Sequence, residues 1–248
     1  MNRTLQKARH HAISYALIAP AFLALAVFVF EPIVYSLVLS FQKYRLGFAT
    51  RRFVGFENFK NLLASPEFWQ SLAITAVYSV YMVAASLVLG LFLAVVITGR
   101  KRDAAFWQVI YFLPVTATMA AMAIVWRFIL NDDFGFLNNL LRALHLPVVN
   151  WLKDPRTAMG SVIFISVWAN AGYAMVLFLA GIANIPGSLY EAAAIDGSNK
   201  GQDFRFITWP LISPTTLFAV IIMTRRALSS FDSIKVLTNG GPINSTRV

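Results

Sequence analysis

The feature that most constrains this chain is a set of five long stretches without aspartate, glutamate, lysine or arginine. A helix needs about 20 apolar residues to cross the roughly 30 Å hydrocarbon core of a bilayer. Backbone groups in lipid must be paired, and barrel strands would be shorter and alternating. We therefore predict an all-α, polytopic transmembrane helix bundle that forms a single domain, 1–248. The charge-free stretches are 12–30, 68–99, 104–126, 157–190 and 206–224, and the spans are 13–40, 71–98, 104–129, 158–181 and 206–228.

The composition favours membrane lipid, and not nucleic acid, as the partner of the basic residues. The chain is 58% hydrophobic and 13% charged, whereas soluble domains carry about 25% charged residues. Its net charge of +10 comes from lysines and arginines scattered at the ends of the predicted spans, where they favour lipid headgroups and set topology. Those in the N-terminal tail and the four loops between the spans divide equally, eight on each side, and only their density in loop 99–103 favours a cytoplasmic N-terminus.

The basic N-terminal tail and the apolar run after it resemble a secretory signal peptide. The run is longer than the apolar region of such a signal, and no clear small-residue cleavage site follows it. We interpret it as a first span that is retained, with a break at Pro32 beside Glu31, because proline removes one helix hydrogen bond.

A polar segment, residues 184–205, separates the fourth predicted span from the fifth. Pro186-Gly187 ends the fourth span. Ser188 lies three residues before Glu191, which is the spacing of a capping box at the start of a short helix. Glu191 could equally contact a partner protein, and both interpretations stay open.

A turn and a second helix follow within this segment. Asp196-Gly197 is a turn signal, since glycine accepts a positive φ, and Ser198 or Asn199 can cap the next helix. The segment is therefore predicted to form a short helix–turn–helix at the membrane surface. Its alanine-rich face is narrow enough to pack into a groove on another protein.

The letters E-A-A-A-I-D-G, followed by F-x-x-I-x-x-P-x-x-x-P, resemble the cytoplasmic coupling motif of ABC importer permeases. In that family the motif inserts into a cleft on the ATP-hydrolysing subunit. The resemblance implies that partner ATPase subunits bind and use ATP, and that this chain binds no cofactor. The matching positions are Glu191, Ala192, Ala193, Asp196, Gly197, Phe204, Ile207, Pro210 and Pro214.

Further stretches resemble the sugar-permease branch of that family, which includes the maltose and glycerol-phosphate permeases. The resemblance covers almost the whole chain and is typical of the first of two permease subunits. It implies an ATP-driven importer of a sugar or sugar-like solute in the inner (cytoplasmic) membrane. It also implies a different second permease and an extracytoplasmic solute-binding protein as partners. The stretches are 53–59 (FVGFENF), 112–114 (FLP), 138–144 and 237–242 (LTNGGP).

Asn170 and Tyr173 are the candidates for contact with the solute. They lie three residues apart in the fourth predicted span and therefore share one helix face. Sugar sites use aromatic faces and amide hydrogen bonds. The alternative interpretation is packing between helices, because asparagine also joins spans to one another.

Two features depart from the family pattern. Family members usually have a sixth span after the glycine-rich outer loop, so we expect five spans present and the usual sixth missing. Arg225 and Arg226 fall where the fifth span should still be apolar. Arginines there would reach the interface, line a wet cavity or reflect an altered C-terminal region.

Two other classes of membrane protein fit the sequence less well. An ion-coupled secondary transporter needs charged residues near the middle of the membrane, and only Glu31 and Arg127 are available. A membrane enzyme needs clustered acids or histidines, and the adjacent Asp132 and Asp133 also fit a helix-capping loop. The three histidines (His10, His11 and His145) have no zinc-site spacing. We therefore predict neither a metal site nor an enzyme.

Overall fold

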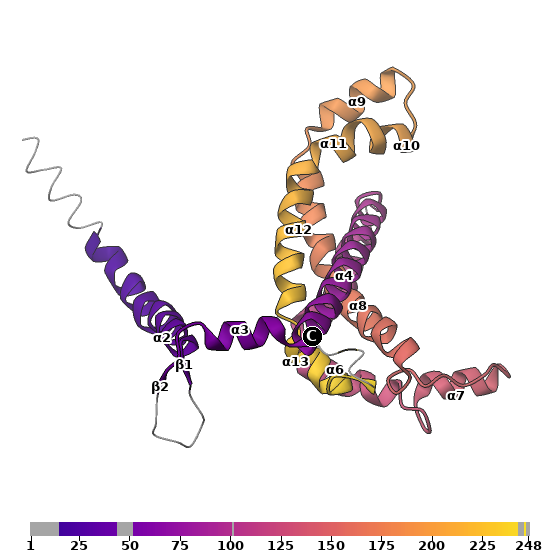
Figure 1. The fold of residues 1–248 in the computed structure, drawn as a ribbon. Coiled ribbons are helices and arrows are strands. Elements are labelled where there is room, and N and C mark those ends of the chain that lie inside the picture. Colours follow the sequence, from indigo (N-terminus) through magenta and orange to yellow (C-terminus); the bar gives the residue numbers. More distant parts are fainter. Residues whose placement is uncertain (1–14, 44–51, 101, 243–245, 247–248) are drawn as a thin grey trace, which may run out of the picture. The chain divides into compact units, whose positions relative to one another are not determined.

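The computed structural model describes most of the chain, which divides into two compact units, Met1–Trp69 and Gln70–Val248 (Figure 1). The basic N-terminal tail, with His10 and His11, lies outside the described residues. That residues 1–248 form one domain stays a prediction. The described residues are 15–43, 52–100, 102–242 and 246, without the side chains of 231–233.

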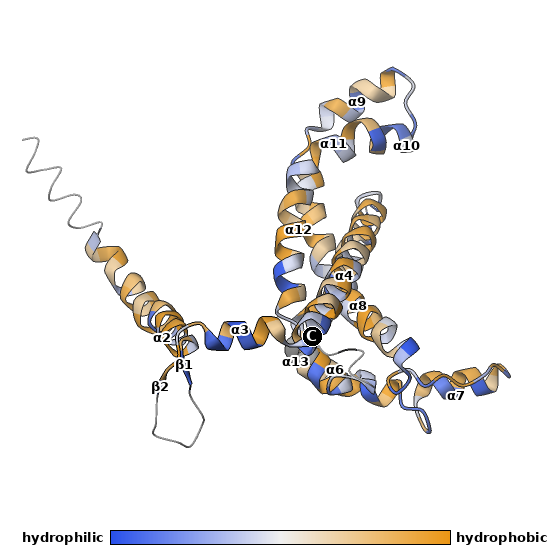
Figure 2. Ribbon diagram, viewed as in Figure 1, coloured by the Kyte–Doolittle hydropathy of each residue, from blue (hydrophilic) through white to orange (hydrophobic). Residues whose placement is uncertain are grey.

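Three described helices are long and apolar enough to cross a membrane, and two bent helix pairs raise the number to five if each pair is one span. Hydrophobic residues dominate these helices (Figure 2). The described strands form a single two-stranded sheet, so the prediction of an all-α membrane protein is confirmed. The three helices are Tyr15–Ser40, Pro66–Thr98 (α4) and Pro155–Ala183 (α8), and the pairs are Ala104–Thr116 (α5) with Met119–Ile129 (α6), and Lys200–Leu211 with Ser213–Leu228 (α12).

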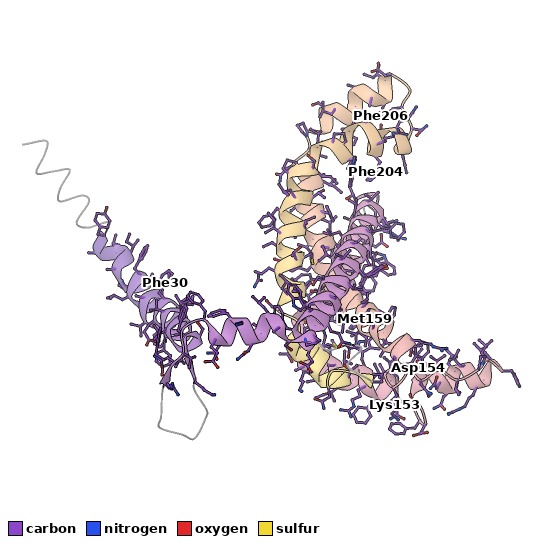
Figure 3. All side chains as sticks on the ribbon, in the orientation of Figure 1. Phe30, Lys153, Asp154, Met159, Phe204 and Phe206 are labelled. Carbon is purple, nitrogen blue, oxygen red and sulfur yellow. The ribbon has the colours of Figure 1, made fainter. Side chains whose placement is uncertain are left out.

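The first of these helices is continuous, so the predicted break at Pro32 was wrong. A π-helical turn, Ala26–Phe30 (η1), precedes α2, Glu31–Ser40, and Pro32 lies in the first turn of α2. This wider turn accommodates the ring of Pro32 and its missing N–H, which the interior of a regular α-helix would not tolerate. The apolar side chains of this helix, including Phe30 (Figure 3), are exposed within its unit.

The stretch FVGFENF closes the end of this first helix. Asn58 donates from its amide to two carbonyl oxygens at the helix end, at 2.8 and 3.0 Å. The rings of Phe41, Phe56 and Phe59 cluster with centroids between 5.3 and 6.0 Å apart. The stretch therefore has a structural role in this chain. Its elements are β1, Gln42–Lys43, β2, Arg52–Phe53, antiparallel to β1, and α3, Glu57–Ala64.

The third predicted span, 104–129, is bent by 97° between α5 and α6. Pro114 in the last turn of α5 has no N–H to donate. Ala117 and Thr118 are then extended, and the Thr118 hydroxyl accepts from the amide of Ala121 at 3.4 Å, as the N-cap of α6. The single continuous helix expected here is therefore replaced by two.

The fifth predicted span, 206–228, is divided as well, with a bend of 66° at Ile212. Pro210 and Pro214 stand in the first turns of the two helices that meet there. A missing N–H costs nothing at that position, so the two prolines favour a new helix start over a continuous helix. The elements are η2, Phe204–Thr208 (π-helical), α11, Trp209–Leu211, and α12.

A carboxylate organises the short basic loop before α5. Oδ2 of Asp103 accepts from Nε1 of Trp107 at 2.6 Å and from Nη1 of Arg100 at 2.8 Å. The hydrogen bond from Trp107, followed by the interactions with Arg100, lowers the pKa of the Asp103 carboxyl below its ordinary value of 3.8. The carboxylate therefore stays ionised at the start of α5.

Helix α13, Phe231–Thr238, was not predicted, because its sequence was interpreted as part of an outer loop. Ile234 and Leu237 are 2% and 4% exposed and belong to the same apolar cluster as Val162 and Ile165 of α8. The spacing of three residues places Ile234 and Leu237 on one helix face. This buried face is what makes the segment helical.

Glycines allow α8 to approach its neighbours closely. A Cβ atom added to Gly172 would overlap the carbonyl oxygen of Tyr111 on α5, and one added to Gly90 of α4 would collide with Ala174. Helices in membranes often pack through small residues in this way, because small residues let the two backbones come into contact. Gly160 on the same helix α8 has open space around it.

A buried asparagine organises the loop between α6 and α8. Helix α7, Phe136–Ala143, is the short helix predicted there, and its Asn138 is 1% exposed. The amide donates to the carbonyl oxygens of Asp132 (3.2 Å) and Val149 (3.0 Å). The side-chain oxygen accepts from the backbone amide of Val149 (3.2 Å) and from Nε1 of Trp151 (3.0 Å). One side chain thus joins both ends of the loop.

We expect Asn138→Ala to lower the free energy of unfolding by about 2–4 kcal/mol, since each buried polar group left unpaired costs about 1–3 kcal/mol. Thermal unfolding of the purified protein in detergent would measure the change. Asn139→Ala is the matched control, because its hydrogen bonds are exposed, and a loss below about 1 kcal/mol is expected. Equal losses in the two variants would contradict the role given to Asn138.

Candidate coupling surface and solute site

The segment after α8 contains the predicted helix–turn–helix. Helix α9, Gly187–Ile195, ends in a turn and is followed by α10, Lys200–Asp203. Gly197 has a φ of +80°, a conformation that residues with a Cβ rarely adopt. Its amide donates to the carbonyl of Ala194 at 3.2 Å, and the next amide donates to that of Ala193 at 3.0 Å, which closes the helix end.

The capping box lies at the second helix and not at the first, where it was predicted. Helix α9 begins after Pro186 without a side-chain cap, so the predicted pairing of Ser188 with Glu191 is wrong. Proline at the cap position supplies no side-chain acceptor. Asn199 instead caps α10 and forms a reciprocal box with Gln202, with bonds of 2.8 to 3.0 Å.

The coupling-motif residues on α9 and its turn point mainly away from the rest of the chain. Ile195 is 87% exposed, and Ala193 is half-buried. An exposed isoleucine amid alanines forms an apolar surface that lacks a covering segment in the described part of this chain. The exposed motif residues are Glu191, Ala192, Asp196 and Gly197.

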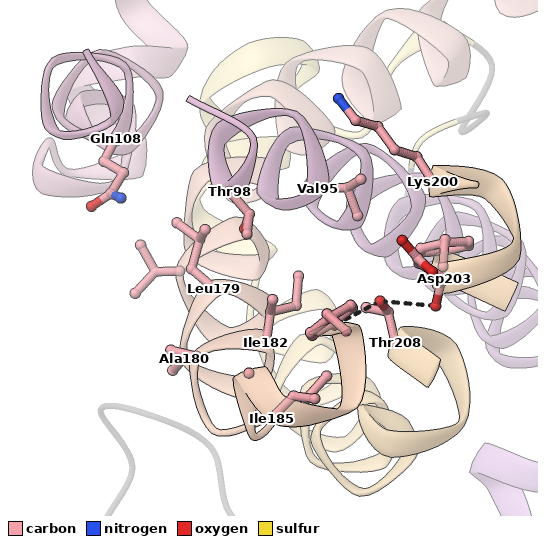
Figure 4. Close-up of a pocket in the computed structure, with 15 residues that line it drawn as sticks. Val95, Thr98, Gln108, Leu179, Ala180, Ile182, Ile185, Lys200, Asp203 and Thr208 are labelled. Carbon is pink, nitrogen blue, oxygen red and sulfur yellow. Dashed lines mark hydrogen bonds between the residues drawn. The ribbon is translucent and has the colours of Figure 1, made fainter. Parts of the chain in front are cut away.

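Hydrogen bonds fix the base of this segment (Figure 4). The hydroxyls of Tyr190 and Thr208 lie 2.9 Å apart, and that of Thr208 also donates to the carbonyl of Asp203 at 3.3 Å. Oγ of Ser198 donates to Oδ1 of Asp203 at 2.5 Å. The four residues join α9 to the helix Lys200–Leu211 that precedes α12, and so link the two arms of the helix–turn–helix to each other. Of the remaining motif residues, Phe204 and Ile207 are half-buried, and Pro210 and Pro214 are exposed.

A cavity of about 740 Å³ lies beneath this segment. Its walls come from α4, α5, α8 and the segment itself, including Thr98, Gln108, Lys200 and Phe204 (Figure 4). The lining is mainly apolar, as in a junction between packed helices.

The two predicted solute contacts meet Arg226 inside the bundle. Oδ1 of Asn170 accepts from Nε of Arg226 at 2.7 Å, and the guanidinium lies 4.8 Å from the centroid of the Tyr173 ring. Nδ2 of Asn170 donates to the carbonyl of Ser166 at 2.8 Å, and Oγ of Ser166 accepts from the hydroxyl of Tyr78 at 3.0 Å. Asn170 is 3% exposed, whereas Tyr173 and Arg226 are half-buried, and the cluster lies between α4, α8 and α12.

This arrangement distinguishes the two arginines that departed from the family pattern. Arg225 is exposed, whereas Arg226 is half-buried and turned toward α8. Asn170 lies at the middle of the 29-residue helix α8. The sequence marked Arg226 as anomalous without indicating its partners, and it gave no signal for Tyr78, which comes from α4.

The coupling-motif residues and the solute candidates occupy separate parts of the structure. The surface segment follows the last residue of α8, Ala183, whereas Asn170 and Tyr173 lie in its interior. The coupling-motif residues therefore lie together in one place and the solute candidates together in another, and α8 connects the two places.

Apolar helices of membrane-spanning length, packed around a polar cluster and carrying an exposed helix–turn–helix on one of their connections, define a polytopic membrane protein. The comparisons with known proteins identify its family. The sequence matches the family described as "Binding-protein-dependent transport system inner membrane component" over residues 62–248. The chain belongs to this family, whose members are permeases of ABC transporters.

Curated relatives match nearly the whole chain. A probable ABC transporter permease protein of Pyrococcus horikoshii is 35% identical over 229 residues, which are 92% of this chain and 78% of that protein. The trehalose/maltose transport system permease protein MalF of Thermococcus litoralis is 32% identical, over 97% of this chain and 81% of its own length. The lactose transport system permease protein LacF of Rhizobium radiobacter is 34% identical, over 99% and 83%.

The fold is also similar to that of solved structures. A bacterial alginate ABC transporter, crystallised in complex with an alginate pentasaccharide-bound periplasmic protein, has a chain that matches with a TM-score of 0.85. The two sequences are 24% identical, and the match covers 99% of this chain and 82% of that one. This likeness supports the permease fold.

Proposed function

We propose that this chain is one of two different permease subunits of an ATP-driven importer for a sugar or sugar-like solute in the cytoplasmic membrane. The observation that carries the proposal is the exposed surface of α9, with Ile195 and Gly197 at its end. A rigid, apolar helix end of this kind is suited to insertion into a groove on a second protein. Two of the relatives are named as sugar transport permeases.

In this proposal, α9 docks on an ATPase subunit, and this chain binds no ATP. Movements of the ATPase pass into the bundle because the bonds among Tyr190, Thr208 and Asp203 tie the segment to the spans. Glu191 is exposed and takes no part in a capping box, so its carboxylate is free to contact the ATPase in this proposal. The chain contributes a pathway and no bond chemistry.

The solute passes the cluster of Asn170 and Tyr173 in the interior of the bundle. An extracytoplasmic solute-binding protein delivers the solute, and the second permease completes the pathway. The apolar side chains of the first helix are exposed within its own unit, so lipid, the other unit of this chain or a partner protein has to cover them.

Affinity purification of the tagged chain in mild detergent, followed by mass spectrometry, tests this assembly. We expect an ATPase subunit and a second permease to be recovered with the chain. Ile195→Glu should reduce recovery of the ATPase at least tenfold, because it places a charge in the docking surface. Leu146→Glu, at an exposed leucine in the loop after α7, is the matched control and should leave recovery unchanged.

The result that would overturn the proposal is recovery of the chain without an ATPase subunit. That outcome would instead favour a secondary transporter driven by an ion gradient. Loss of ATPase in both glutamate variants would place the docking surface elsewhere.

A further inference from the structure

Arg226 stands in the last turn of α12, where the helix dipole favours a positive charge, but its guanidinium reaches across to the interior of another helix. It is hydrogen-bonded to Asn170 at the middle of α8, far along the helix from both ends. Charged groups within spans are costly, and they generally mark a substrate or ion pathway. Extension of the side chain to the headgroup region does not account for the charge, because Nε is held inside the bundle.

Most of the hydrogen-bonding capacity of this arginine is unused. A guanidinium has five N–H donors, and Nε–H is the donor engaged by Asn170. Among the described residues, neither Nη group takes part in a hydrogen bond or an ion pair. The two ion pairs found among those residues join Arg100 to Asp103 and Lys153 to Asp132. Within the part of the chain that the structure describes, both Nη groups are therefore available to a ligand.

The neighbours of Arg226 hold the guanidinium in one orientation. Asn170 is itself fixed by its bond to the carbonyl of Ser166, and the Tyr173 ring lies 4.8 Å from the guanidinium. A fixed guanidinium presents a planar fork that matches the two oxygens of a carboxylate or phosphate. A neutral sugar would need the amide and the ring but no positive charge.

We propose that the solute carries an acidic group, a carboxylate or a phosphate, which pairs with Arg226. This inference rests on the proposed function and narrows its substrate class from sugars in general to acidic sugars or sugar phosphates. The oxyanion of a lipid headgroup is the other source of the same chemistry. Helix α8 extends about 20 Å beyond Asn170 in each direction, so we assign the site to the solute.

Matched pairs of probes test the charge. The complete transporter, in nanodiscs of uncharged phosphatidylcholine, is titrated with galacturonate and galactose, and with glycerol 3-phosphate and glycerol. We expect each acidic member to bind at least tenfold more tightly than its neutral partner. Repeating the titration in nanodiscs with anionic lipid, and with inorganic phosphate alone, should give no competing occupation of the site.

Variants of the two adjacent arginines locate the charge. Arg226→Gln should abolish the preference for the acidic members, whereas Arg225→Gln, which removes the same charge from the exposed neighbour, should preserve it. Arg226→Lys keeps the charge without the planar fork and should retain a reduced preference. This variant decides the question if Arg226→Gln fails to fold.

Several outcomes would overturn the inference. They are equal binding of acidic and neutral members, no measurable binding of the acidic members, a preference that survives in Arg226→Gln, and equally tight binding of inorganic phosphate. Competition by anionic lipid would assign the site to headgroups. Each of these results leaves the importer intact as long as the ATPase and the second permease are recovered with the chain, so the two proposals fail separately.

Discussion

Replacing Gly172 by alanine is expected to prevent accumulation of correctly folded protein. The added Cβ would overlap the carbonyl oxygen of Tyr111 and also approach Phe112. These are backbone atoms that cannot rotate away, so α5 and α8 must separate. Overpacking costs about 1–3 kcal/mol where side chains can adjust, and a backbone collision should exceed about 3 kcal/mol. Fluorescence-detected size-exclusion chromatography and thermal unfolding would measure the loss.

Gly160→Ala is the control for this experiment. It lies on the same helix with open space around it, and alanine is a better helix former than glycine by about 0.5–1 kcal/mol. We expect unchanged or slightly higher stability. Similar behaviour of the two variants would show that α5 and α8 are not packed as described.

Replacing Gly197 by aspartate is expected to leave the protein inserted and folded but to reduce transport at least tenfold. A Cβ at this position meets nothing within 4 Å in this chain, so the folded bundle has room for a side chain. A partner that docks against the turn does not, and a buried unpaired carboxylate opposes docking. Solute-stimulated ATP hydrolysis by the complete transporter would be measured.

The positive φ of Gly197 adds backbone strain, which must be separated from the effect on docking. Asparagine tolerates this conformation better than most residues and has the shape of aspartate without its charge. We expect Gly197→Asn to fold normally and to be partly uncoupled. Gly187→Ala, also without neighbours within 4 Å, should behave as the unchanged protein. Normal ATP hydrolysis in Gly197→Asp would contradict docking at this turn.

The sequence predicted the apolar helices well because charge-free stretches of this length have few alternatives in lipid. It did not predict how those helices are interrupted. Pro32 was expected to break a helix and is instead accommodated by a π-helical turn. Pro114 lies inside the predicted continuous span 104–129, and a bend of 97° follows it. Whether the helix breaks at a proline therefore depends on the residues that follow it and not on the proline itself. After Pro114, Thr118 caps a new helix.

The candidate site was predictable to the extent that it depends on local sequence. The turn at Gly197 follows from the dipeptide Asp196-Gly197, whereas the partner of Arg226 does not follow from any spacing, because α8 and α12 are brought together by packing. The capping box was assigned to Ser188 since its spacing fits, and Asn199 carries it instead. Both segments have the spacing of a capping box, and the first does not form one because Pro186 occupies the cap position of α9.

Helix α8 is unbroken over its 29 residues, and its proline stands at the N-terminal turn. The helix pairs beside it are bent by 97° and 66°. A straight α-helix is stiff in torsion, and the distance from Asn170 to the helix end at Ala183 is about 20 Å at roughly 1.5 Å per residue. Any twist applied at its surface end must therefore turn the amide of Asn170 through nearly the same angle. Asn170 and the surface end of α8 then share one rotational degree of freedom, so in the proposed importer a rotation imposed at the docking surface would reorient the solute site.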